Sequence, residues 1–324
     1  MINKPIAIIA GEPNSISSEI IFKCWLLRRK YSFKPFFIIG SYKTLNLQKK
    51  KLKYQLRIKK ININFSIDDL KTNELPVYDI KYDQKRAFEK ISSKSNTYIL
   101  KCFDEAIKLV KTKELIGLIN CPISKEFLFK KKHQGITEFL AKKTFTSGNE
   151  VMLIYNKKLS VSPMTTHIPL NKVSNKINKS EIVKKVKIIN FFFYKIFKKK
   201  PNFAILGLNP HNFTTSKKSE EKNIILKAIT ELKRFKIKVL GPIPTDSSFM
   251  NFKKNKFDVI IGMYHDQVLT PFKALYKFKA INITLGLPFI RISPDHGVAE
   301  NITSNKVADP ESLIESIKFF NYIK

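Results

Sequence analysis

The stretch PIAIIAGEPNSISSEIIFKCWLLRRKYSFKPFFIIG, residues 5–40, contains a complete strand-helix-strand unit. Two short apolar runs, at 5–11 and 34–40, predict buried strands. The segment between them predicts a helix over 17–30, with Ser17 or Ser18 as its N-terminal cap. Its apolar residues fall on one face: Ile20, Ile21, Cys24, Trp25 and Leu27. A strand that is followed by a helix and then another strand predicts parallel pairing.

The same alternation recurs along the chain. Further helices are predicted at 96–112, 181–197, 220–235 and 309–323, with strands at 114–122, 202–210, 237–242 and 257–261. The runs 150–164 and 280–293 predict hairpins added to the sheet. Repeated units of this kind predict an α/β fold of mainly parallel sheets with helices on both faces. Since 324 residues exceed what one hydrophobic core usually serves, we expect two α/β/α domains, one of 1–130 plus 300–324 and one of 131–299.

Composition excludes several classes of protein. Hydrophobic residues make up 43% and charged residues 27% of the chain, and the mean hydropathy is -0.18, which is typical of a globular protein. No run of eighteen apolar residues occurs, and the first strand turns at Gly11 before a signal-peptide core could form. We therefore expect a cytoplasmic protein without a membrane partner. Three separated cysteines with no CxxC spacing predict neither a disulfide framework nor a thiolate zinc site.

The formal net charge of +34 raises the possibility of a nucleic-acid partner. The excess is mostly lysine, spread over many short runs, and it accompanies a chain that is rich in Ile, Asn and Phe and poor in Gly. No helix-turn-helix, zinc-finger or RRM-type signature accompanies it. The pattern favours solvated lysine faces and no specific nucleic acid.

Three of the five histidines directly follow predicted strands: His167, His211 and His265. Ligands of open α/β sheets collect where strands end and helices begin. Each histidine taken alone predicts a strand-end side chain that is bonded to a backbone carbonyl. Taken together, three imidazoles with an open coordination position could hold a divalent metal that polarises a substrate oxygen. Their spacing makes such a site possible but, unlike HExxH, does not by itself predict convergence.

Several ordered blocks of sequence carry a resemblance to a known family. They are TTHIPL at 165–170, GLNPH at 207–211, GPIPTDSSF at 241–249, GMYHDQ at 262–267, and NITLGLPFIRIS with DHG at 282–297. In order and approximate spacing they resemble the signature blocks of the 4-hydroxythreonine-4-phosphate dehydrogenases (PdxA family) of pyridoxal phosphate biosynthesis. The resemblance covers nearly the whole chain, from Gly11 to Ala299.

The resemblance implies roles for individual residues. His167, His211 and His265 match the family's metal ligands, which both subunits of a dimer supply around one site. Residues that hold the phosphorylated substrate are matched by Thr137, Lys273, Asn282 and Arg291. Two of these are cations suited to phosphate, and an amide both donates and accepts hydrogen bonds.

Two aspartates match catalytic carboxylates near the substrate, for proton transfer or for binding its amino group: Asp246 and Asp266. The alternative for Asp246 is a turn aspartate, and for Asp266 it is a helix N-cap.

The implied reaction is oxidation of 4-phosphohydroxy-L-threonine by NAD or NADP to a 3-oxo acid, which loses carbon dioxide to give 3-amino-2-oxopropyl phosphate. One divalent ion (zinc, magnesium or cobalt) would serve each site of a homodimer. The implied fold is similar to isocitrate and isopropylmalate dehydrogenases, with the active site in the interdomain cleft at the dimer interface. No GxGxxG occurs, so no nucleotide contacts are assigned.

The chain departs from the family pattern in three loops. Ile136 stands where a substrate-contacting histidine is expected, and His133 is a candidate to compensate. The loops GEPNSISSEI at 11–20 and NFTTSKKSEE at 212–221 lack the usual glycines, which permit positive φ and close backbone approach. Two alternatives therefore stay open, a dehydrogenase of another 4-phosphorylated hydroxy acid and a catalytically impaired, basic descendant that binds nucleic acid.

Overall fold

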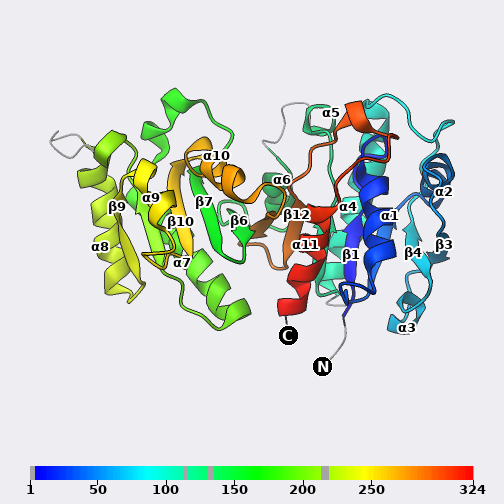
Figure 1. The fold of residues 1–324 in the computed structure, drawn as a ribbon, viewed down its shortest axis with the longest axis horizontal. Helices are drawn as coiled ribbons and strands as arrows, with labels where there is room; N and C mark the ends of the chain where they lie inside the picture. The colour runs from blue at the N-terminus through cyan, green and yellow to red at the C-terminus, as the bar shows by residue number, and fades with distance from the viewer. Residues whose placement is uncertain (1–3, 113–114, 130–134, 213–218, 324) are drawn as a thin grey trace. The chain divides into compact units, whose positions relative to one another are not determined.

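The chain divides into two compact units in the computed structural model, which describes residues 4–112, 115–129, 135–212 and 219–323 (Figure 1). Unit 1 contains residues 1–140 and 288–324, and unit 2 contains residues 141–287. The sequence placed the boundaries near 130 and 300. Thr137 and Arg291 therefore belong to unit 1, whereas the prediction assigned them to the second domain. His133 lies outside the described residues.

Unit 1 is built on a parallel sheet with the strand order β3-β4-β2-β1-β5-β12. The central strand β1 pairs Ile6 with Phe36 of β2 and with Gly117 of β5. The strands are β1 Ile6–Ile9, β2 Phe36–Gly40, β3 Arg57–Ile61, β4 Glu74–Asp79, β5 Gly117–Asn120 and β12 Arg291–Pro294. Because β1, β2 and β5 are buried throughout, they carry continuous apolar runs, as strands covered on both faces do.

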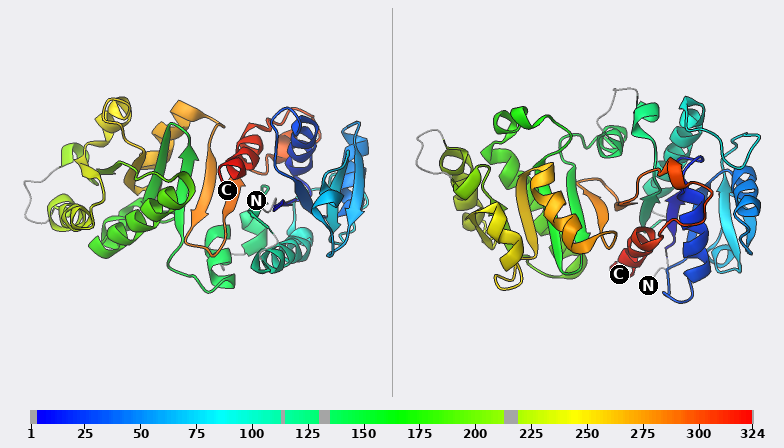
Figure 2. Two further views of the ribbon diagram at one scale, coloured as in Figure 1. Left: turned by 90° about the horizontal axis from the view of Figure 1, so that it is seen from below. Right: turned by 45° about the horizontal axis from the view of Figure 1, so that its top comes forward.

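Helices cover both faces of this sheet. α1 and α11 contact each other on one face, and α4 packs on β1, β2 and β5 from the other (Figure 2). The helices are α1 Ser17–Leu27, α2 Tyr42–Lys51, α3 Ile67–Leu70, α4 Asn96–Lys111, α5 Lys125–Phe129, α6 Ile136–Lys143 and α11 Glu311–Phe319. The predicted serine cap of α1 is wrong, because Ile16 is the N-cap and no side chain caps the helix. Ser17 and Ser18 are buried residues of its first turn instead.

Unit 2 has a mixed sheet with the strand order β11-β6-β7-β10-β8-β9. β6 runs antiparallel to both β11 and β7, which confirms the hairpin at 150–164, and the pairs from β7 to β9 are parallel. The strands are β6 Val151–Asn156, β7 Leu159–Thr165, β8 Phe203–Leu206, β9 Val239–Ile243, β10 Val259–Tyr264 and β11 Ile281–Leu285. With unit 1, this confirms the predicted α/β class.

The helices of unit 2 also lie on two faces (Figure 2). α10 contacts β7 and β10 and, with α9, closes a hydrophobic core that contains Val161, Ile260 and Phe272. α7 packs on β6, β7 and β11, and α8 packs on β9. The helices are α7 Lys179–Phe197, α8 Leu226–Arg234, α9 Thr245–Asn251 and α10 His265–Tyr276, with a π-helical turn at Glu221–Ile225 that leads into α8.

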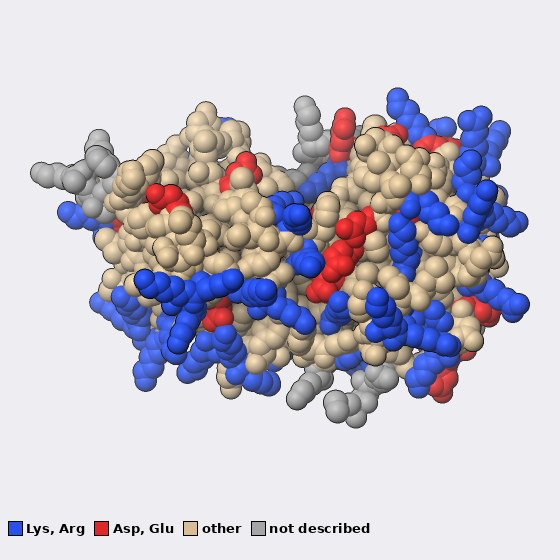
Figure 3. Space-filling model, viewed as in Figure 1, with Lys and Arg blue, Asp and Glu red and all other residues tan. Residues whose placement is uncertain are grey.

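The surface agrees with the composition. On the face drawn in Figure 3, Lys and Arg are spread over both units and Asp and Glu are interspersed among them. Within the part of the chain that the structure describes, no helix has the length and apolarity needed to cross a bilayer. All three cysteines are free and buried, and burial raises the pKa of each thiol.

Candidate active site

Two of the predicted metal ligands lie together at the carboxyl ends of neighbouring strands in unit 2. β7 and β10 are parallel, and the register pairs Thr165 with Tyr264. His167 follows the first strand by two residues, and His265 begins α10 directly after the second. Their ring centroids are 5.9 Å apart. The parallel register therefore explains why two histidines almost one hundred positions apart in sequence become neighbours.

The third predicted ligand, His211, follows β8, the strand on the other side of β10. It lies in the short 3-10 helix Pro210–Asn212 and has a positive φ of 54°. His167 also has a positive φ, of 50°. Left-handed backbone is uncommon for residues other than glycine and clusters at functional sites.

A buried carboxylate holds the loop that carries His211. Glu221 is fully buried and accepts hydrogen bonds from the backbone N–H groups of Leu208 and Asn209, at 2.8 Å each. The Ser219 hydroxyl donates a further bond of 2.7 Å. Burial by itself raises the pKa of Glu221, but these hydrogen bonds outweigh it, so the pKa falls below the ordinary value. No signal in the sequence indicates this role.

Gln267 ties three segments of the site together. Its Oε1 accepts from the backbone N–H of Met263 at 2.6 Å. Its Nε2 donates to the carbonyl of Gly207 at 2.7 Å and to the Thr245 hydroxyl at 2.8 Å. One buried amide thus fixes the ends of β8 and β10 and the start of α9. It stands within the GMYHDQ block, yet sequence reasoning missed it.

The histidine pair is compatible with a shared metal. Two imidazoles on one tetrahedral ion, with a metal–nitrogen distance of about 2.1 Å, have ring centroids about 5 Å apart. The separation of 5.9 Å between His167 and His265 is close to that value. Nevertheless, among the described residues the chain contains no group of three or more His, Cys, Asp or Glu placed to hold a metal. The three-histidine site therefore stays a prediction.

The two predicted catalytic aspartates both lie in first turns of helices. Asp266 is exposed and its Oδ1 lies 2.7 Å from Nδ1 of His265. Asp246 lies in the first turn of α9 and accepts from the backbone N–H of Ser247 at 2.8 Å. Neither residue is the N-cap of its helix. The capping alternative for Asp266 is therefore wrong, and its carboxylate instead orients an imidazole.

The predicted substrate ligands of unit 2 lie on α10 and β11. Lys273 is exposed and lies eight residues after His265, about 12 Å along the helix axis. Asn282 is half-buried on β11, and its Oδ1 has no hydrogen-bond partner among the described residues. A buried amide oxygen without a partner is costly, and a ligand that donates a hydrogen bond would remove that cost.

Unit 1 contains a buried guanidinium. Arg291 is 3% exposed at the start of β12, and its Nε donates to Oδ1 of Asn120 at 2.8 Å. Burial lowers the pKa of Arg291 to about 10, with Glu138 acting in the opposite direction. Burial, and then the positive charge of Arg291, also lower the pKa of Lys125. The positive charge of Arg291 thus disfavours the charged form of Lys125, and an anion beside the two side chains would favour both charged forms. Lys125 was not predicted.

Ile136 and Thr137 begin α6. Ile136 is only 6% exposed, so this side chain packs in the interior of unit 1. Thr137 is half-buried beside it. The position where the family pattern expects a polar substrate contact is thus part of the apolar packing.

Comparison with known proteins places the chain in a family. The family model described as pyridoxal phosphate biosynthetic protein PdxA matches residues 32–320. The chain is 38% identical, over 98% of both sequences, to 4-hydroxythreonine-4-phosphate dehydrogenase of Sulfurihydrogenibium sp. (strain YO3AOP1). It is 32% identical, again over 98% of both, to a Salmonella typhi protein provisionally named D-threonate 4-phosphate dehydrogenase.

A solved structure agrees with this match. The 4-hydroxythreonine-4-phosphate dehydrogenase of Klebsiella pneumoniae superimposes with a TM-score of 0.84, at 29% identity and with 99% of each chain covered. Both the sequence relationship and the fold extend over essentially the full chain. The protein belongs to the PdxA family of pyridoxal phosphate biosynthetic proteins.

Proposed function

We propose that this protein oxidises 4-phosphohydroxy-L-threonine with NAD or NADP. Hydride leaves the carbon that bears the secondary hydroxyl, one proton is released, and the 3-oxo acid loses carbon dioxide to give 3-amino-2-oxopropyl phosphate. The observation that carries the proposal is the full-length match to relatives named 4-hydroxythreonine-4-phosphate dehydrogenase.

The histidines at the strand ends would hold the divalent ion: His167, His211 and His265. When bound, the ion supplies a positive charge that favours loss of the hydroxyl proton and then draws electrons from the ketone. Gln267 and Glu221 hold the loops that carry His211 and His265, through the hydrogen bonds at Met263, Gly207 and Asn209. Asp266 keeps the His265 ring oriented through its contact with Nδ1.

Other residues of the proposed site recognise the substrate. Arg291 and Lys273 supply positive charge for its phosphate. Asn282 supplies an amide to the polar groups of the substrate, and Thr137 supplies a hydroxyl. Asp246 is proposed to bind the ammonium group or to accept a proton.

The nicotinamide carries the hydride, and the protein aligns it with the substrate carbon. We further propose that two chains form a homodimer and share each active site. This proposal can be tested by mixing two inactive variants, Arg291→Gln from unit 1 and His265→Gln from unit 2. A shared site predicts that the mixture regains activity that neither variant has alone.

The test of the reaction is formation of NADH or NADPH from 4-phosphohydroxy-L-threonine by the purified protein. The assay is run after treatment with a chelator and again after zinc, magnesium or cobalt is returned. Activity that the chelator abolishes and a divalent ion restores supports the proposal. Full activity after chelation, or no activity with any ion, contradicts it.

A second substrate is favoured by a specific observation. Ile136 is buried and cannot hydrogen-bond the substrate, and a relative with 32% identity is named for D-threonate 4-phosphate. Since both molecules carry a 4-phosphate, the same cations would bind either. The ratio of kcat/KM for the two substrates decides which of them the site prefers.

A further inference from the structure

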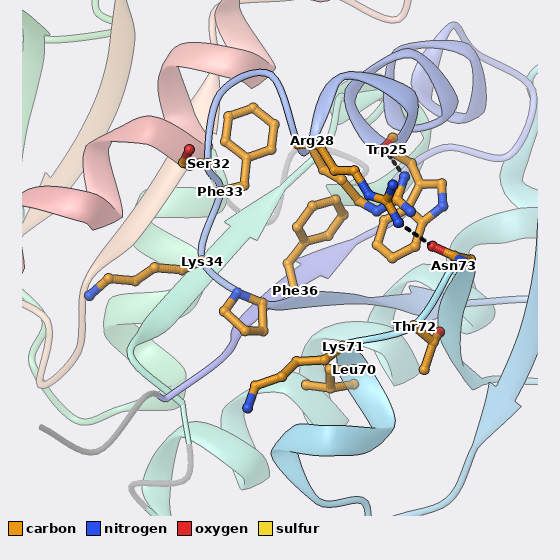
Figure 4. Close-up of a pocket in the computed structure, with 12 residues that line it drawn as sticks. Trp25, Arg28, Ser32, Phe33, Lys34, Phe36, Leu70, Lys71, Thr72 and Asn73 are labelled. Carbon is orange, nitrogen blue, oxygen red and sulfur yellow. Dashed lines mark hydrogen bonds between the residues drawn. The ribbon is translucent and has the colours of Figure 1, made fainter.

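Unit 1 contains a pocket that the proposed reaction does not use (Figure 4). Its volume is about 290 Å³, and it lies between the end of α1, the start of β2 and the segment that follows α3. Twelve described residues line it. Four of them are cationic and none is acidic: Arg28, Arg29, Lys34 and Lys71.

Aromatic rings form a firm base beside these cations. The rings of Trp25 and Phe36 meet edge to face at 5.3 Å, and those of Phe33 and Phe36 at 6.3 Å. Trp25 and Phe36 are each 2% exposed. The Arg28 guanidinium lies over the Trp25 ring, 4.1 Å from its centroid.

The turn that joins α1 to β2 is tightly hydrogen-bonded. The Phe33 N–H donates to the Arg28 carbonyl at 3.1 Å, and the Ser32 N–H donates to the Arg29 carbonyl at 3.2 Å. Ser32 itself has a positive φ of 48°. A turn closed in this way keeps the cations of the α1 terminus in a fixed arrangement.

The four cations keep most of their donors available. Arg28 donates to the Trp25 carbonyl at 2.8 Å, and Lys34 donates to the Ile323 carbonyl at 2.7 Å. Arg29 donates to the neutral Asn73 at 2.7 Å, and among the described residues only Lys71 has a carboxylate partner, the exposed Asp68 at 3.0 Å. A guanidinium has five N–H donors and an ammonium three, so each side chain can also bind a ligand.

The electrostatics support an anion here. Burial, and then the neighbouring Arg29, lower the pKa of Arg28, and burial lowers the pKa of Lys34. The contribution of Arg29 to the Arg28 shift indicates that positive charge in the pocket is incompletely compensated. A bound anion would compensate it.

The pocket and Arg291 lie at different strands of the sheet in unit 1. Phe36, which lines the pocket, is the first residue of β2, whereas Arg291 begins β12, and β1 and β5 lie between these two strands. Neighbouring strands are about 4.8 Å apart, so three spacings separate β2 from β12 by about 14 Å. A ligand in this pocket is therefore separate from one held by Arg291.

We propose that this pocket binds a small phosphate-bearing molecule at a second site. Guanidinium and ammonium groups on two sides of a pocket match the charge and the several acceptor oxygens of a phosphate. The volume is at the lower end of the range for small-molecule sites. The ligand is accordingly of about the size of a phosphomonoester with one ring.

Trp25 makes the test specific, because it is the only tryptophan of the 324 residues. Intrinsic tryptophan emission therefore reports on this pocket alone. The intact protein is titrated with inorganic phosphate, pyrophosphate and phenyl phosphate at constant ionic strength. We expect a saturable change in emission, with equilibrium dialysis of radiolabelled pyrophosphate giving the same affinity.

Two charge-matched variants decide the location. Arg29→Gln with Lys71→Gln removes two exposed cations of the pocket. It should weaken binding about tenfold or more, which corresponds to one charge-assisted hydrogen bond. Lys222→Gln with Lys227→Gln removes the same charge from α8 and its preceding turn in unit 2 and should leave binding unchanged. In Arg291→Gln, which alters the candidate active site, the emission change of Trp25 should persist.

The proposal is overturned if dialysis and emission show no saturable binding, or if sodium chloride alone reproduces the change. Equal weakening by both double variants would also overturn it, since the effect would then be general charge screening. If phenyl phosphate binds more tightly than inorganic phosphate, the aromatic base contributes to recognition. Equal affinities for the two compounds would mean that the site recognises only the phosphate group.

Discussion

Replacement of Gln267 by leucine tests how the loops of the candidate site are held. Gln267 is 6% exposed and makes three hydrogen bonds, to Met263 N–H, Gly207 carbonyl and Thr245 hydroxyl. Leucine fills much of the same volume but leaves the two backbone groups buried without a partner. Each such group costs about 1–3 kcal/mol. We therefore expect the variant to lose about 2–6 kcal/mol of local stability.

Hydrogen exchange is measured by mass spectrometry on peptides from β10 and α10. It therefore reports on the local stability of unit 2 separately from that of unit 1. A loss of 2 kcal/mol corresponds to exchange that is about thirtyfold faster. The matched control is Asn251→Leu, an exposed amide of α9 with a single bond to the Ser247 carbonyl at 3.1 Å. This change should alter stability by less than about 0.5 kcal/mol.

The same experiment shows whether the account of Gln267 is correct. If exchange in β10 and α10 is the same in Gln267→Leu and Asn251→Leu, the amide does not hold these segments. If exchange accelerates as expected, the variant should also bind a divalent ion more weakly than wild type, because the loops that carry His211 and His265 are no longer fixed.

Four further predictions concern other buried groups. Glu221→Gln should lower the free energy of unfolding by about 1–3 kcal/mol near neutral pH. Because the pKa of Glu221 is lowered in the folded protein, its carboxylate stabilises the protein at pH values above the ordinary pKa of 4.5. Urea unfolding at several pH values should show that the stability difference between wild type and the variant disappears as the pH falls below 4.5. Ile136→Ala should cost about 2–5 kcal/mol in the same assay and leave KM unchanged; a raised KM without a loss of stability would mean that Ile136 contacts substrate. Since burial lowers the pKa of Arg291 to about 10, the Kd for the phosphorylated substrate should rise as the pH approaches that value and the guanidinium loses its charge; the control is Arg291→Gln, whose Kd should be high at every pH. The native protein should resist a thiol reagent and react only after unfolding, because its three cysteines are buried and have raised pKa values: Cys24, Cys102 and Cys121. Rapid labelling of any one of them in the native protein would contradict its burial.

The strands of the interior could be predicted, but the edge of unit 1 could not. β1, β2 and β5 are buried at every position, so they carry unmistakable apolar runs. β3, by contrast, is RIKKI, and Ile58 is its only buried residue. An edge strand needs few apolar side chains and is commonly protected by lysine. Its lysines were interpreted simply as a solvated surface.

The positions of the candidate ligands could also be predicted, whereas the residues that support them could not. Histidines that follow strands belong to a recognisable pattern, and the parallel register of β7 and β10 brings two of them together. A buried Gln267 or Glu221 looks like any surface residue in a sequence, because its hydrogen-bond partners are distant along the chain or belong to the backbone. The unit boundary near 288 could not be predicted either, because no change in composition marks a linker there.

The most direct test of the proposed metal-dependent dehydrogenase compares wild type with His265→Gln. Divalent-metal content and NADH formation from 4-phosphohydroxy-L-threonine are measured on the same preparations, with hydrogen exchange to verify that unit 2 remains folded. We predict that the folded variant loses both the metal and the activity, whereas wild type treated with a chelator regains both when the ion is returned. A folded His265→Gln protein that retains wild-type metal content and activity would contradict the central claim.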